Sequence, residues 1–148
     1  MSTLAAIKTV LESDGTLLAL ATGGIWDFDE TGREGLNRTT TPAAFDANGI
    51  LKPSVLLRLR SDVPDYVLAD DSEQYVSTKE MIEAWIVSDR SHSTIESIGN
   101  RIYALLHATQ TGGSFAVRWA GTFRGDRDTA LDGVWDRLEF QVTTYRSV

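Results

Sequence analysis

Cysteine is absent from the 148 residues of this chain, and histidine occurs twice. The absence of cysteine excludes disulfide bonds, thiolate zinc sites and cysteine nucleophiles. His92 lies between two serines, but sequence neighbours need not face each other, so no paired nucleophile and base is predicted. No apolar run approaches the ~20 residues that cross a bilayer, and the N-terminus lacks the pattern of a signal peptide. We therefore expect no membrane partner and a cytoplasmic site of synthesis.

Basic residues are also scarce, with 14 Lys and Arg against 21 Asp and Glu and a net charge of −7. Because phosphate binding needs clustered Lys and Arg, this balance argues against a protein that binds nucleic acid tightly. One segment holds five acidic residues and no basic residue, namely Asp62, Asp65, Asp70, Asp71 and Glu73. It is interpreted either as a solvated loop or as a surface that repels a polyanion.

The stretch from Ser72 to Gln110 carries the clearest pattern in the chain. From Tyr75 to Val87, apolar residues recur at every second position, which is typical of a strand with one buried face. Ser93 and Glu96 then form a capping-box signature at the start of a helix. One stripe of this helix is apolar at helical spacing and is expected to pack on the even-numbered face of the strand, with residues Ile95, Ile98, Ile102, Leu105 and Leu106.

The remaining chain supplies a helix near the N-terminus, a loop at about 29–53, and three more strands. The strand from Ser54 to Arg60 is expected to bury Val55, Leu57 and Leu59, and residues 62–71 follow as an acidic connection. Strands near 115–124 and 134–145 follow the central helix. The prediction is one α+β domain over residues 1–148, with an antiparallel four-stranded sheet in the order strand-strand-helix-strand-strand and helices on one face.

No arrangement of side chains in the sequence predicts catalysis. Asp126, Asp128 and Asp132 superficially resemble a calcium loop, but their spacing to Gly133 and the lack of a later glutamate do not fit one. No pair of carboxylates is placed in a cleft by its spacing. We therefore expect no enzymatic activity, no catalytic residue, no metal site and no cofactor.

Tryptophan on an otherwise polar sheet face needs an explanation. Trp85 and Trp135 fall on the face opposite the predicted helix packing, together with Met81, Val87 and Tyr145. Either the first helix or the long loop covers them, or they lie in a subunit interface, where aromatic residues are enriched. The interface hypothesis assigns the contact between subunits to Trp85, Trp135, Met81 and Tyr145.

The order of these elements resembles the tail terminator proteins of long-tailed bacteriophages, also called tail completion or head–tail joining proteins. The resemblance covers a helix ending near Leu11, a Gly-Gly-Ile-Trp segment, the Pro-Ser-Val-Leu-Leu strand, the strand from Tyr75 to Val87, the helix after it and the closing strand. It implies a virion protein of the tail or neck. Six copies of this protein would form a ring that caps the tail tube and stops polymerisation of the tube. The partners so implied are the tail-tube protein and a neck or connector protein.

The resemblance adds a role for the acidic segment, because DNA would pass through the ring without binding to it. Asp70, Asp71 and Glu73 are expected to face the channel and repel the phosphates. Two alternatives stay open, which are another structural subunit (a connector stopper or a tail-tube protein) and a small carboxylate-dependent enzyme.

Overall fold

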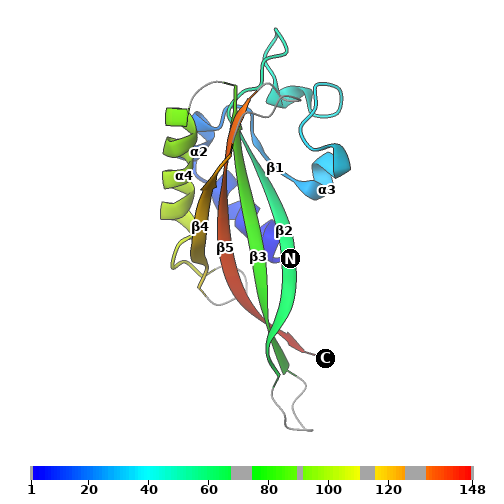
Figure 1. Ribbon diagram of the computed structural model, residues 1–148, viewed down its shortest axis with the longest axis vertical. Helices are drawn as coiled ribbons and strands as arrows, with labels where there is room; N and C mark the ends of the chain where they lie inside the picture. Colours follow the sequence, from blue (N-terminus) through cyan, green and yellow to red (C-terminus); the bar gives the residue numbers. More distant parts are fainter. Residues whose placement is uncertain (1, 68–74, 90–91, 111–115, 126–132, 148) are drawn as a thin grey trace.

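A twisted five-stranded sheet is the centre of the fold (Figure 1). The computed structural model describes residues 2–67, 75–89, 92–110, 116–125 and 133–147. In chain order the elements are α1 (Thr3–Glu12), α2 (Gly15–Leu20), β1 (Ile25–Asp27), α3 (Phe28–Thr31), β2 (Ser54–Val67), β3 (Tyr75–Ser88), α4 (His92–Leu106), β4 (Arg118–Arg124) and β5 (Val134–Ser147). Within these residues no helix is long and apolar enough to cross a membrane.

The strand order is β1-β2-β3-β5-β4, so the two predicted hairpins join through β3 and β5. The α+β class is confirmed, but the count of four strands is wrong. The additional strand is β1, which pairs in parallel with Val55 to Leu57 of β2. Three residues are too few to show a period of two, and the parallel partner lies far along the chain, so the sequence pattern does not reveal this pairing.

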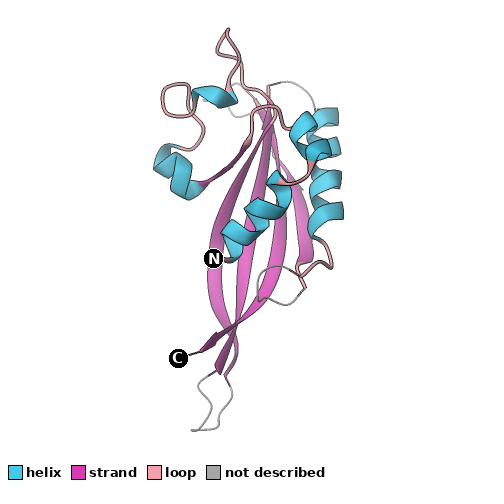
Figure 2. Cartoon of the chain, turned by 180° about the vertical axis from the view of Figure 1, so that it is seen from behind, coloured by secondary structure: helices cyan, strands magenta, loops and turns pink. Residues whose placement is uncertain are grey.

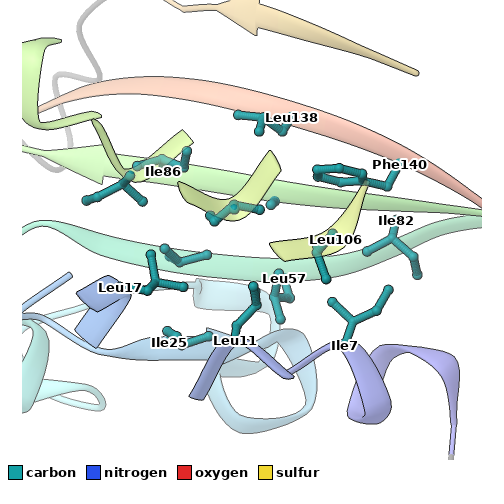
Figure 3. Close-up of a cluster of buried hydrophobic side chains, with 14 of the residues drawn as sticks. Ile7, Leu11, Leu17, Ile25, Leu57, Ile82, Ile86, Leu106, Leu138 and Phe140 are labelled. Carbon is teal, nitrogen blue, oxygen red and sulfur yellow. The ribbon is translucent and has the colours of Figure 1, made fainter. Parts of the chain in front are cut away.

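The main core lies between the sheet and α1, α2 and α4, which cover one face (Figure 2). Ile95, Ile98, Ile102 and Leu106 of α4 are fully buried, and they face the even-numbered side chains of β3 as the sequence predicts. Leu105 is half-buried at the margin of this cluster. Figure 3 shows the side chains that α1, α2 and the sheet contribute, including Ile7, Leu11, Leu17, Leu57, Ile82 and Phe140.

An ion pair ties α2 to α4 beside this core. The carboxylate of Asp14 caps α2 by accepting from the backbone N–H of Leu17 at 2.8 Å. It also accepts two hydrogen bonds from the Arg101 guanidinium, at 2.6 and 2.9 Å. The hydrogen bonds from Arg101 lower the pKa of Asp14 from 3.8 to about 2. The charged form of Asp14 is therefore the form that the folded chain favours.

Two of the predicted boundaries are wrong. α4 begins at His92, so Ser93 lies inside its first turn instead of capping it. β2 continues through the acidic segment to Val67, where the sequence indicates a connection from residue 62. Beyond Leu57, β2 has no partner on its outer side in the described sheet, and such an edge strand tolerates Pro64. The same open edge explains why Leu59, expected in the core, is 42% exposed.

The segment 28–53 is folded, although it shows no sustained period in the sequence. Asp27 and Glu30 form a capping box at α3, and a 3-10 turn covers Pro42–Ala44. Phe45 and Leu51 pair as an isolated bridge. The segment packs on the sheet face opposite α4, where Leu36, Ala44, Phe45 and Leu51 form a second apolar cluster with Val87 of β3. Local hydrogen bonds and this small cluster, rather than a periodic pattern, hold it in place.

Candidate functional site

Trp85 and Trp135 come together on the face predicted for them. Trp135 of β5 pairs with Val87 of β3, two residues along from the pair Trp85 and Arg137 and therefore on the same face. The two ring centroids lie 4.7 Å apart at an angle of 45°. The indole N–H of Trp85 donates to Glu83 Oε2 at 2.9 Å. Both indoles are half-buried, and the segment 28–53 packs against Trp135 as part of the second apolar cluster.

The segment and the sheet enclose a cavity of about 630 Å³. Its lining is mostly apolar, with side chains from both sides, namely Phe28, Leu36, Phe45, Leu56, Trp85, Val87 and Trp135. Polar groups from Glu34, Asn37, Arg38, Thr39 and Arg58 complete it. A concave, largely apolar surface with a few polar groups is the usual form of a binding site. This cavity is therefore the part of the tryptophan face that is open to a ligand or partner.

Two guanidinium groups lie at the cavity without a carboxylate partner among the described residues. Arg58 sits over the Phe28 ring at 5.2 Å, and Arg38 over the Phe45 ring at 5.1 Å. Arg38 also donates from Nε to the carbonyl oxygen of Gly49 at 2.7 Å. These contacts fix the two side chains while leaving further N–H groups available for an anion. The charged groups at the cavity are therefore these two arginines and the carboxylate of Glu34.

Farther along the same face, two buried glutamates are held by arginines. Glu83 and Glu139 are 3% and 7% exposed and occupy paired positions on β3 and β5. Arg60 Nη1 lies 2.9 Å from Glu139 Oε1, and Arg137 Nη2 lies 3.2 Å from the same oxygen. Arg137 also sits between the rings of Trp85 and Phe123, at 5.3 and 4.7 Å. Arg60 Nε also lies 3.8 Å from Glu83 Oε1, so each of the two buried carboxylates faces a cation.

The other residues assigned to the interface and channel lie away from the cavity. Met81 is half-buried on the same face, opposite Gln141 of β5. The backbone of Tyr145 pairs with Ser77 near the far end of β5, and its side chain is outside the described part. Asp70, Asp71 and Glu73 fall in the connection between β2 and β3, outside the described residues. Their channel role stays a prediction.

The described residues contain no group of three or more His, Asp or Glu side chains that could hold a metal ion. His107 accepts a hydrogen bond at Nδ1 from the backbone N–H of Trp119, at 3.1 Å, and stacks on Tyr103. This histidine therefore stabilises the start of β4. Sequence reasoning missed Arg38 and Arg58, since neither belongs to a motif and only the fold of the segment 28–53 brings them to the tryptophans.

No protein-family model matches this chain, and no curated protein matches it. Among solved structures, the chain is similar to a protein in the virion of a native gene transfer agent particle. The TM-score is 0.71 at 13% sequence identity, over 98% of this chain and 96% of that one. A similarity that spans nearly the whole of both chains, at so low an identity, establishes a shared α+β fold.

Proposed function

We propose that this chain is a structural subunit of a phage-like virion, where it forms a ring that caps the tail tube and joins it to the head. The observation that carries the proposal is the fold match to a gene transfer agent virion protein across nearly the full length of both chains. The order of sequence elements, which resembles tail terminator proteins, supports the same place in the particle. The ring is proposed to be hexameric, with a tail-tube protein and a neck protein as its partners.

The tryptophan face is the proposed contact between subunits. Trp85 and Trp135 lie at a cavity in a face with a large aromatic and arginine content, and both residue types are enriched at the centres of interfaces. A closed ring needs two different patches on each subunit. The cavity side of the molecule would supply one of them, with Met81 farther along the same sheet face and Tyr145 at the β5 position that pairs with Ser77.

Particle assembly without this chain tests the function. If the chain caps the tube, its removal gives tubes of uncontrolled length that do not join heads, visible by electron microscopy. Tails of normal length that remain headless would indicate a connector stopper instead. A complete loss of tubes would indicate a tube subunit. Full-length tails joined to heads would overturn the proposal.

A further inference from the structure

A second concave surface lies between α4 and β4, at the edge of the sheet. Its volume is about 400 Å³, and it is here called the α4–β4 groove. It is open because α4 packs mainly on β3 and β5, while every side chain position of β4 except half-buried Gly121 is exposed. The exposed part of its lining consists of Glu96, Asn100 and Tyr103 from α4 and Trp119, Thr122 and Arg124 from β4.

Two aromatic rings in this groove are exposed but held in place. Tyr103 is 41% exposed and Trp119 is 43% exposed. Their rings make an edge contact, with 5.7 Å between centroids. The indole N–H of Trp119 also donates to Thr122 Oγ1 at 3.1 Å, and Tyr103 stacks on His107. Tryptophan and tyrosine are the residue types that most often dominate the binding energy of a protein contact, and rings already fixed in position lose little freedom on binding.

The groove carries one carboxylate that is not bound within the described part of the chain. Glu96 is exposed and makes no hydrogen bond or ion pair with another described residue. The other carboxylate of the groove belongs to Asp136, which Arg124 Nε approaches to 3.4 Å. Glu96 is therefore the anion that the groove can offer to a cationic partner.

The cavity on the other face of the sheet has the opposite need. Arg58 and Arg38 line it and have no carboxylate partner among the residues that the structure describes. Glu34, the carboxylate of the same lining, accepts a hydrogen bond from Asn37 Nδ2 at 3.0 Å. A further carboxylate could accept the free guanidinium N–H groups, and an aromatic ring could fill the apolar part of the cavity.

The two surfaces are placed so that they can meet only between different copies. The cavity lies toward β1 and β2 at one edge of the sheet, and the groove lies at α4 and β4 at the other edge (Figure 1). Leu138 of the groove pairs with Ala84 of β3, which is next to Trp85 of the cavity. The surfaces therefore lie at the same level along the strands, on opposite faces of the sheet. A neighbour in the same orientation could cover one with the other without a shift along the strands.

We propose that the α4–β4 groove of one copy docks on the cavity of a second copy, with the Glu96 carboxylate facing the two cavity arginines and the Trp119 ring against the apolar lining. This inference rests on the proposed ring function and supplies the second of the two patches that a ring needs. Because the patches differ, the contact is head-to-tail, and such a contact closes into a ring when the rotation between copies returns to the start.

Charge exchange tests the contact. Arg58→Glu and Glu96→Lys each place like charges at it, whereas the double variant restores opposite charges in exchanged positions. We expect each single variant to raise the concentration for half-assembly by roughly tenfold or more, measured by sedimentation velocity and native mass spectrometry. The double variant should assemble near the wild-type concentration. An equal mixture of the two single variants should do the same, in rings where the two variants alternate.

Truncation of the exposed ring tests the apolar part of the contact. Trp119→Ala should also raise the concentration for half-assembly. Phe123→Ala is its matched control, because Phe123 is a 45% exposed ring of the same strand that lines neither the groove nor the cavity. Glu12→Lys repeats the charge change of Glu96→Lys at an exposed position of α1. Both controls should leave assembly unaltered, and circular dichroism melting curves check that every variant is folded.

Three results would overturn this inference. The first is a wild-type chain that stays monomeric. The second is assembly of both single charge variants and of Trp119→Ala at the wild-type concentration. The third is weakened assembly of both single charge variants without recovery in the double variant. In each case, tails of uncontrolled length in particles that lack the chain would still support the tube-capping function, so failure of the contact and failure of the function are distinguishable.

Discussion

Replacement of Ile102 by alanine probes the packing of α4 on the sheet. Ile102 is fully buried in the main core, on the stripe that includes Ile98 and Leu106. The change removes three carbon atoms, worth about 0.8 kcal/mol each in transfer free energy. The unfilled space adds to this loss, so the free energy of unfolding should fall by about 3–4 kcal/mol, within the range of ~2–5 kcal/mol for such truncations.

The assay is thermal and urea denaturation followed by circular dichroism at one protein concentration. For a chain of this size, each kcal/mol lowers Tm by roughly 2–4 °C, so Tm should fall by about 6–16 °C. Leu105→Ala is the matched control, because Leu105 is the neighbouring half-buried aliphatic residue on the same helix. It should cost about half as much. A melting temperature for Ile102→Ala within about 2 °C of wild type would refute the placement of α4.

Three further predictions follow from particular contacts. Asp14→Asn keeps a capping side chain but removes the ion pair with Arg101. It should therefore lower Tm at neutral pH. The difference in Tm from wild type should shrink as the pH falls from about 4 toward 2. Gly125→Ala would place a Cβ 1.9 Å from the Trp135 ring, so it should shift that ring and change the near-ultraviolet circular dichroism. Trp85→Ala and Trp135→Ala should each move the sedimentation profile toward smaller species.

The sign of the pH dependence follows from the direction of the shift. The pKa of Asp14 is lowered in the folded chain by its hydrogen bonds with Arg101. Its contribution is therefore complete above the ordinary value of 3.8 and is lost as the pH falls through the folded value of about 2. A constant difference between wild type and Asp14→Asn from pH 5 to pH 2 would contradict this account. For the tryptophans, unchanged sedimentation of both variants would exclude them from the subunit contact.

Gly15→Ala is the control for the glycine prediction, since no atom lies within 4 Å of the added Cβ at that position. Its near-ultraviolet spectrum should match that of the wild type. An unchanged spectrum in Gly125→Ala as well would show that Trp135 does not pack against the end of β4.

Periodic patterns predicted the centre of this fold because burial there follows a regular geometry. Ile98 and Ile102 repeat at helical spacing, and Ile82 and Ile86 fall on alternate strand positions, so each element has one apolar side. The pairing of β1 with Val55 to Leu57 of β2 joins segments that are far apart in the sequence. No local pattern encodes such a tertiary contact. The same limit explains why the exposure of Leu59 at an open edge was not predicted.

A bulge limits what alternation can predict for β4. The register shifts between Trp119 and Gly121, so Trp119 pairs with Phe140 while Phe123 pairs with Arg137 on the opposite face. The sequence places both aromatic residues on one face. Because one extra residue at a bulge reverses the side that every later residue faces, the strand can be predicted while the orientation of half of it cannot.

The candidate site was predictable in part for a similar reason. Trp85 and Trp135 occupy regular strand positions, so their shared face follows from the period of two. Arg38 reaches the cavity through a segment that is shaped by local hydrogen bonds, including those from the backbone of Thr39 and Thr40 to the Asn37 side chain. Such a segment has no periodicity from which the position of its side chains could be inferred.

The most direct test of the ring function is the position of this chain in assembled particles. Particles that carry a gold-labelled version of the chain can be imaged by electron microscopy, with the label counted along each tail. The account predicts label confined to one end of the tail tube, at its junction with the head. Label distributed along the tube, or absent from particles, would contradict it.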